Sequence, residues 1–143
     1  MFLGQYEHSI DEKGRLIMPS KYRESLGDEF IITFGLDTCL FVYSLSEWKM
    51  ISEKIKSFPL GKKDARAFSR ILFSRALNCS MDNQGRINIA KYLKDYAHIN
   101  KEIMIIGVSD RIEIWNRELW QKYSTEMVDS YEDIAERIYE QEG

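Results

Sequence analysis

The turn sequence Asp-x-x-Gly-Arg occurs twice in this chain, and that repetition limits the possible fold more than any other feature. It appears as IDEKGR at residues 10–15 and as MDNQGR at residues 81–86, so the two aspartates and the two arginines are each 71 positions apart. At an offset of 72, the segment CLFVYSLSEW (39–48) aligns with RIEIWNRELW (111–120). The difference of one residue fits an insertion in an intervening loop, where added residues cost little. The spacing therefore predicts a tandem duplicated β-β-α-β-β-α unit.

Each copy shows the residue patterns of short strands and short helices. A glycine-containing turn between two short segments is typical of a β-hairpin, so we expect residues 6–11 to pair with residues 15–19. A proline and a glycine bound the short helix expected at 19–27. β-Branched and aromatic residues predict strands at 29–35 and 39–44.

Helix-capping residues follow the strands in both copies. Ser44, with Glu47 three positions later, predicts the start of a longer helix, and Pro59 predicts its end. Asn116 occupies the capping position that corresponds to Ser44 in the second copy.

A single copy of about 45 residues would be marginally stable alone. Two copies that interleave their hairpins would close one shared barrel and remove the exposed sheet edges. We therefore expect a mainly β fold with helices, in which the two units form one barrel. The expected segments are a first repeat at 5–47, a helical linker at 48–75, a second repeat at 76–119 and a C-terminal helix at 120–143.

Charge is distributed unevenly along the chain. The 143 residues carry a formal net charge of −3, so any nucleic-acid binding has to depend on local basic surface. Residues 54–75 contain seven basic residues and one acid, whereas residues 126–142 contain seven acids and one arginine. Both segments have helical apolar periodicity. They are expected to pair within one subunit, to pair between neighbouring subunits, or to stay apart.

The residue types that carry most enzyme chemistry are sparse. His8 and His98 are isolated, Cys39 and Cys79 form no Cys-x-x-Cys pair, and no nucleophile, zinc or phosphate-loop motif is present. We therefore expect no catalytic residues, no metal, no cofactor and no small-molecule substrate. The cysteines are expected to be buried thiols of a cytoplasmic protein, since the sequence also shows no signal peptide and no apolar run of about 20 residues.

The repeated turn has a definite chemistry. An aspartate that begins a turn accepts backbone N–H groups ahead of it, and a glycine supplies positive φ. Asp11 and Gly14 should therefore shape the first turn and hold Arg15 in one orientation, and Asp82 and Gly85 should do the same for Arg86; such an arginine suits phosphate or the O6/N7 edge of guanine. The same pair also serves as a simple brace of a hairpin, and the turn alone leaves both interpretations open.

The two segments IDEKGRLIMPSKYR and MDNQGRINIAKYLK, with the linker phrase SFPLGKKDARAFSRILFS, resemble the MraZ family of the AbrB/SpoVT-like swapped-hairpin superfamily. The resemblance covers essentially the whole chain. It implies a pseudo-two-fold swapped-hairpin barrel and a nucleoid-associated transcriptional regulator of its own cell-division and cell-wall operon. It also implies that rings of subunits bind short direct repeats in promoter double-stranded DNA. The family pattern departs at Ala90, where the first copy has Pro19, and at the polar Asn88.

By this resemblance, Arg15 and Arg86 are the expected DNA contacts, and Asp11 and Asp82 orient them. Lys13 at the first turn and Lys21 and Arg23 on the following helix are further candidates for phosphate contact, or else solvated surface charges. The alternative function is a protein-interaction or antitoxin-like scaffold without direct DNA readout. Its interface anchors, which otherwise serve as core or subunit-contact residues, would be the large aromatic side chains Phe2, Phe41, Tyr43, Trp48 and Trp120.

Overall fold

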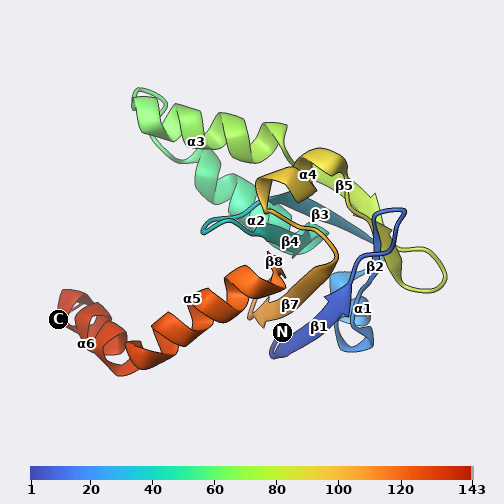
Figure 1. Ribbon diagram of the computed structural model, residues 1–143. Helices are drawn as coiled ribbons and strands as arrows, with labels where there is room; N and C mark the ends of the chain where they lie inside the picture. The colour runs from blue at the N-terminus through green and yellow to red at the C-terminus, as the bar shows by residue number, and fades with distance from the viewer. Residues whose placement is uncertain (143) are drawn as a thin grey trace.

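The computed structural model describes residues 1–142 and places two helical arms on a β-sheet core (Figure 1). The strands are β1 (Gln5–Ser9), β2 (Arg15–Ile17), β3 (Glu29–Phe34), β4 (Leu40–Ser44), β5 (Leu77–Ser80), β6 (Arg86–Asn88), β7 (Glu102–Val108) and β8 (Arg111–Asn116). The helices are α1 (Ser20–Leu26), α2 (Leu45–Lys56), α3 (Lys63–Ser74), α4 (Lys91–Tyr96), α5 (Arg117–Asp129) and α6 (Tyr131–Glu142).

The six longer strands form one antiparallel sheet in the order β1-β7-β8-β4-β3-β5. The two repeats meet at its centre, where β4 pairs with β8 and Phe41 lies opposite Glu113. Each repeat also lends an edge strand to the other, because β1 pairs with β7 and β5 pairs with β3. The tandem repeat predicted from the sequence is therefore present, with its strands shared between the two copies.

The two shortest strands form a separate ribbon in which β2 pairs antiparallel with β6. Leu16 lies opposite Ile87, and both side chains are buried in the core. The expected pairing of residues 6–11 with residues 15–19 is therefore wrong, since β1 and β2 pair with different partners in the second repeat. Both arrangements satisfy the hydrogen bonds inside the turn, so the local sequence does not distinguish them.

The expected closed barrel is not formed. The six-stranded sheet is open, and β1 and β5 are its edges. The physical reason lies in β2 and β6, which are only three residues long and pair with each other instead of joining the two edges. One continuous core nevertheless includes buried residues of both repeats, among them Leu16, Phe30, Ile87 and Ile103.

The predicted capping residues are confirmed in both copies. The Ser44 hydroxyl accepts the Glu47 N–H at 3.3 Å, and Asn116 Oδ1 accepts the Leu119 N–H at 3.0 Å. The first short helix follows Pro19 and ends before Gly27, which has a φ of 86°. These caps fix where each strand pair passes into its helix.

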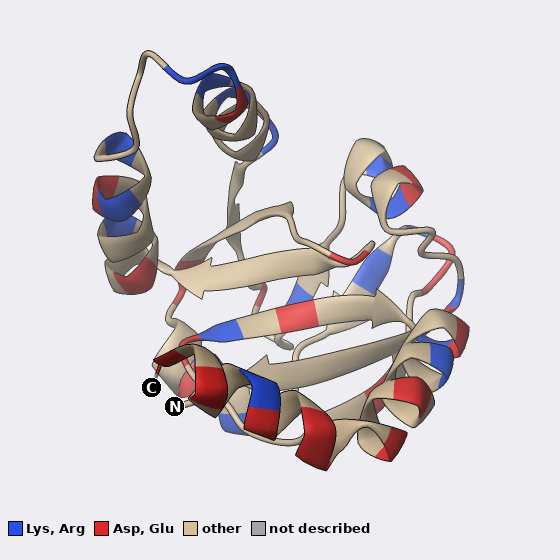
Figure 2. Cartoon of the chain, turned by 90° about the vertical axis from the view of Figure 1, so that its left-hand side faces the viewer, with Lys and Arg blue, Asp and Glu red and all other residues tan. Residues whose placement is uncertain are grey.

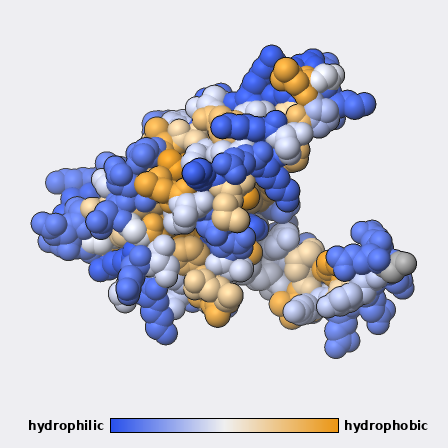
Figure 3. Space-filling view, turned by 180° about the vertical axis from the view of Figure 1, so that it is seen from behind, coloured by the Kyte–Doolittle hydropathy of each residue, from blue (hydrophilic) through white to orange (hydrophobic). Residues whose placement is uncertain are grey.

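Two helical pairs project from the body of the molecule. Helices α2 and α3 form one arm, and α5 and α6 form the other; the two arms are separate projections in the space-filling view (Figure 3). Lysines and arginines gather around the loop between α2 and α3, whereas acids follow the C-terminal helices (Figure 2). Within residues 1–142, no ion pair joins the two arms, so the basic and acidic segments stay apart within one subunit.

The C-terminal segment, expected as one helix, consists of two helices. The helix is interrupted at Ser130. The Ser130 N–H donates to the Met127 carbonyl at 3.2 Å, and the Ser130 carbonyl accepts the Ile134 N–H at 2.9 Å. Aspartate and serine favour helix ends because their side chains compete for backbone hydrogen bonds, and Asp129-Ser130 stands at the break. The last residue of the expected helix, 143, lies outside the described residues.

The candidate interface aromatics divide into two groups. Phe2 and Tyr43 are buried, which assigns them to the interior of the subunit. Phe41, Trp48 and Trp120 are half-buried. Of the two cysteines, Cys39 is buried as expected, Cys79 is half-buried, and both are free thiols. Burial raises the pKa of both thiols.

Candidate nucleic-acid interface

The first Asp-x-x-Gly-Arg turn, between β1 and β2, is held by its aspartate. Asp11 Oδ1 accepts the backbone N–H groups of Lys13 and Arg15, both at 2.9 Å, and Oδ2 accepts Arg15 Nε at 2.9 Å. The Asp11 N–H donates to the Arg15 carbonyl, and Gly14, with a φ of 78°, donates to the Asp11 carbonyl. One carboxylate thus fixes both the backbone and the guanidinium.

The second turn, between β5 and β6, repeats this geometry. Asp82 Oδ1 accepts the N–H groups of Gln84 and Arg86 at 2.9 Å, and Oδ2 accepts Arg86 Nε at 2.6 Å. Gly85 has a φ of 76°. In both turns the aspartate therefore bonds to the backbone and the guanidinium of its own arginine, and the glycine has positive φ.

The hydrogen bonds of the turns lower the pKa values of their aspartates. For both Asp11 and Asp82, backbone N–H donation from the arginine is the largest cause that holds the pKa below its ordinary value of 3.8, and the guanidinium adds to it. Both carboxylates remain charged throughout the neutral and weakly acidic range.

The two turns are locked to each other by backbone bonds. Met18 N donates to the Gly85 carbonyl at 2.9 Å, and Ile89 N donates to the Gly14 carbonyl at 3.0 Å. These bonds flank the β2–β6 pairing symmetrically. Both turns consequently project side by side from the same end of the molecule, opposite the helical arms (Figure 1).

A cation from each repeat covers the turn of the other. A Cβ added at Gly85 would lie 2.3 Å from Arg23 Cζ, and one added at Gly14 would lie 3.1 Å from Lys94 Nζ. Arg23 also donates from Nε to the Met18 carbonyl at 2.9 Å. Arg23 and Lys94 are 71 positions apart, so the repeat offset would have identified Lys94, which sequence reasoning missed.

The outer face of the ribbon carries four side chains. Leu16 and Ile87 point into the core, so the alternation of a strand places the remaining residues on the opposite face. In the register, Arg15 lies opposite Asn88 and Ile17 lies opposite Arg86. The pairing thus brings the two predicted DNA-contact arginines onto one face of one ribbon.

Both arginines are reachable from solvent. Their side chains are 30% and 29% exposed, and within residues 1–142 their side-chain hydrogen bonds use Nε. The Nη1 and Nη2 groups of Arg15 and Arg86 are left to bind an acceptor outside the subunit. Neither guanidinium is sealed in the core.

The remaining predicted contacts lie around this face or on α1. Lys13 is exposed in the first turn, Lys21 is exposed on α1, and Arg23 is half-buried against Gly85. The turns and their covering side chains carry five cations and three acids, although the whole chain is acidic. The five cations are Lys13, Arg15, Arg23, Arg86 and Lys94, and the three acids are Asp11, Glu12 and Asp82.

His8, isolated in the sequence, is partly buried and lies near two arginines in the structure. Burial, then the charges of Arg117 and Arg23, lower the pKa of His8. Within residues 1–142 there is no group of three or more His, Cys, Asp or Glu side chains placed to hold a metal ion. In the same range, none of the helices has the length and apolar character required to cross a bilayer.

We predict that Gly85→Ala lowers the free energy of unfolding by about 1–2 kcal/mol, because alanine at positive φ is strained and its Cβ displaces the Arg23 guanidinium. Denaturant unfolding measures this change. Gly61→Ala is the matched control, since no atom lies within 4 Å of a Cβ built there. Equal stability of the two variants would contradict the geometry of the turn.

We also predict how the turns respond to acid. Because the folded-state pKa of Asp11 and Asp82 lies below 3.8, their contribution to stability is full above that pH and is lost as the pH falls through the lower folded value. An NMR titration of the Arg15 and Arg86 amide signals should therefore show midpoints below pH 3.8. Midpoints at or above that pH would mean that the carboxylates do not accept these bonds.

Comparison with known proteins agrees with this duplicated architecture. A family model described as "MraZ protein, putative antitoxin-like" matches the chain twice, over residues 1–71 and 72–141. A protein of Caldanaerobacter subterraneus subsp. tengcongensis named "Transcriptional regulator MraZ" is 55% identical over 138 residues, which cover 96% of each chain. Proteins of the same name from Alkaliphilus metalliredigens and Natranaerobius thermophilus are 54% and 52% identical, over 98% and 96% of each chain. With matches that span both repeats and nearly its full length, this chain belongs to the MraZ family.

Proposed function

We propose that this chain regulates transcription by binding double-stranded promoter DNA through the β2–β6 ribbon and its two turns. The observation that carries the proposal is the pair of oriented guanidiniums on one exposed face, each fixed through Nε by a carboxylate. The names of the relatives, which are transcriptional regulators, support the same role.

A two-stranded ribbon has a shape that can enter the DNA major groove. The DNA major groove admits a two-stranded β-ribbon, and arginine binds the O6 and N7 atoms of guanine through its two terminal nitrogens. In this proposal the aspartates hold Nε, and the Nη groups of Arg15 and Arg86 donate to base edges or phosphates. Pre-orientation lowers the entropy lost when such long side chains bind.

The other cations serve the phosphate backbone in this proposal. Lys13 and Lys21 are exposed, and in this proposal they bind phosphates directly. Arg23 and Lys94 lie against the turn glycines, where they add positive charge at the rim of the ribbon. Such contacts position a protein on DNA but specify little sequence. The bound chain would be associated with the nucleoid.

We also propose the swapped-hairpin arrangement of the AbrB-like superfamily for the two repeats, at 5–47 and 76–119. The exchange of partners in the β1–β7, β3–β5 and β2–β6 pairs supports it. The two repeats exchange these strand partners although the six-stranded sheet is open and does not close into a barrel.

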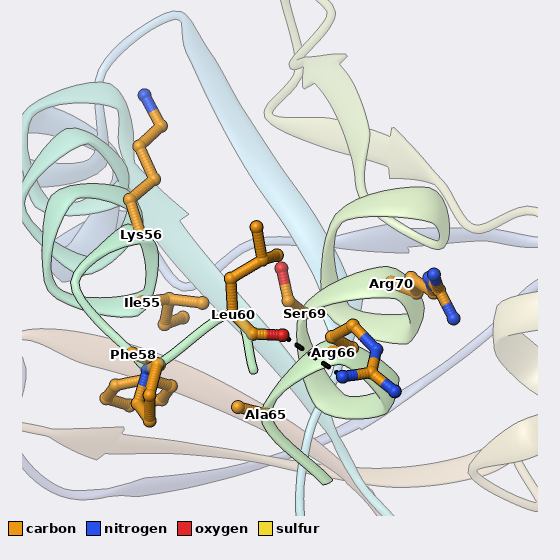
Figure 4. A pocket seen from close by; sticks show the side chains of 9 residues that line it. Ile55, Lys56, Phe58, Leu60, Ala65, Arg66, Ser69 and Arg70 are labelled. Carbon is orange, nitrogen blue, oxygen red and sulfur yellow. Dashed lines mark hydrogen bonds between the residues drawn. The ribbon is translucent and has the colours of Figure 1, made fainter. Parts of the chain in front are cut away.

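A ring of subunits is the assembly that we propose, with the two arms as its contacts. Between α2 and α3 lies a hollow of about 340 Å³ with apolar walls and basic edges (Figure 4). The apolar wall includes Ile55, Phe58 and Leu60, and the basic edge includes Arg66 and Arg70.

The second arm has the complementary character. Its exposed apolar residues are Val128, Tyr131, Ile138 and Tyr139, set among the acids of α5 and α6. In this proposal, one arm of a subunit binds the other arm of the next subunit. Such head-to-tail contacts close a ring when the rotation between neighbouring subunits permits it. A ring bound to the direct repeats upstream of its own cell-division and cell-wall operon would gain affinity by multivalency.

The alternative function is a protein-interaction or antitoxin-like module, and the exposed apolar faces of the arms are the observation that favours it. The response to salt separates the two functions. DNA binding through several phosphates weakens steeply as salt increases, whereas an apolar protein interface does not.

We predict that Arg15→Ala and Arg86→Ala each lower the affinity for DNA from upstream of the chain's own gene by about tenfold or more, since a lost base contact costs about 1–3 kcal/mol. Fluorescence anisotropy at two salt concentrations measures the loss. Lys49→Ala is the control, because it removes an exposed cation from α2, at the other side of the molecule (Figure 1).

Both arginine variants should keep the wild-type melting temperature and oligomeric state, since exposed ion pairs add little stability. Unchanged DNA affinity, or loss of folding in these variants, would favour the role of a simple brace.

We predict that Leu60→Asp and Ile138→Asp each break the assembly into smaller species and abolish the preference for three promoter repeats over one. Both residues are exposed in the subunit, so the subunit fold should persist. Light scattering after size-exclusion chromatography measures the mass, with the exposed Leu36→Asp as the control. Wild-type mass in both variants would rule out this contact between arms.

A further inference from the structure

The two halves of the β2–β6 ribbon are related by a pseudo-two-fold axis between Leu16 and Ile87. This axis relates Arg15 to Arg86, so the charged positions are symmetric. It also relates Ile17 to Asn88, and these two residues differ completely in chemistry. The ribbon therefore has a symmetric backbone and an asymmetric outer face.

Ile17 and Asn88 share that outer face with the arginines. Ile17 lies directly opposite Arg86, and Asn88 lies directly opposite Arg15. Side chains two residues apart on a strand are about 7 Å apart, and paired strands are about 5 Å apart. The four side chains therefore cover a patch comparable with roughly two base-pair steps, at 3.4 Å each.

We propose that Ile17 and Asn88 read bases and make the DNA element bound by each ribbon non-palindromic. The inference rests on the proposed DNA-binding function and adds its specificity residues. Ile17 has the apolar surface that contacts a thymine methyl group, and Asn88 has the amide that pairs with the N6 and N7 atoms of adenine. The arginines supply the guanine contacts on either side.

The position of Ile17 between charged neighbours supports its proposed role in base reading more strongly than its exposure does. It is 46% exposed, and single exposed apolar residues are common on protein surfaces. Ile17, however, stands between two oriented guanidiniums, whereas Leu16 and Ile87 already supply the core contacts of the ribbon. Its side chain is therefore free to contact a ligand that the arginines attract.

Asn88 is placed against the first turn. Its Oδ1 atom lies 3.4 Å from the position that a Cβ would take at Gly14, beside Lys94 Nζ at 3.1 Å from the same position. The amide thus lies where the two turns meet. At Gly85, the three atoms nearest to the corresponding position all belong to Arg23.

An asymmetric ribbon has a consequence for the arrangement of sites. A symmetric ribbon would read an inverted repeat equally well in both directions. With isoleucine in one half and asparagine in the other, one direction is preferred, so successive copies in an assembly would read elements of the same orientation.

The test is selection of bound sequences from random double-stranded DNA by the full chain. The variants are Ile17→Asn, Asn88→Ile and the double exchange of both. Leu36→Asn, a change of the same type at an exposed position in the β3–β4 turn, is the control. Circular dichroism and light scattering monitor fold and assembly in every sample.

Each single variant should lose about tenfold discrimination at one base pair and retain the guanine preferences. The double exchange should restore the wild-type preference. Rotation about the pseudo-two-fold axis brings position 17 onto position 88, so the outer face of the exchanged ribbon carries the same four side chains in the same arrangement as the wild-type face. The control variant should select the wild-type sequence.

Single variants that select the wild-type sequence, or that change only the oligomeric state, would overturn the inference while DNA binding stands. Failure of the double exchange to restore the preference would overturn it as well. The proposed function itself would fail in a different way: the wild-type chain would show no salt-dependent binding to any duplex.

Discussion

The reciprocal pairing of β2 with β6 is the interaction on which the rest of this structure depends. The carbonyl of each turn glycine accepts a hydrogen bond from a backbone N–H of the other repeat. Between these two bonds, Leu16 lies opposite Ile87 in the core. Neither three-residue strand would have a partner within its own repeat. The exchange therefore explains why the unit is duplicated within one chain, since a single copy has neither its sheet partners nor a closed core.

The pairing of β2 with β6 also combines the two Asp-x-x-Gly-Arg turns into one surface. Each aspartate fixes its arginine through bonds within five residues, which the turn sequence alone determines. The antiparallel register then places both guanidiniums on the outer face. A cation from each repeat, Arg23 or Lys94, lies over the glycine of the opposite turn, so the surface behaves as a unit rather than as two independent loops.

Local features of the fold could be predicted from the sequence, whereas strand partners could not. The capping roles of Ser44 and Asn116 follow from nearby residues and are confirmed. The hydrogen bonds of Asp11 and Asp82 likewise join residues within a single turn. The hairpin and the barrel were wrong because a strand reaches its partner through space, and a turn satisfies its own bonds whichever partner is chosen. Lys94 could have been identified from its correspondence to Arg23 at the repeat offset, whereas its contact with Gly14, which crosses between the repeats, could not.

In the proposed complex, DNA contacts the ribbon and both turns. Amide hydrogen exchange of the assembled chain, with and without a promoter duplex, tests it most directly. In the presence of DNA, we expect slower exchange at residues 11–17 and 82–88, and no change in α3. Protection confined to the helical arms, with both turns exchanging as in the free chain, would contradict it.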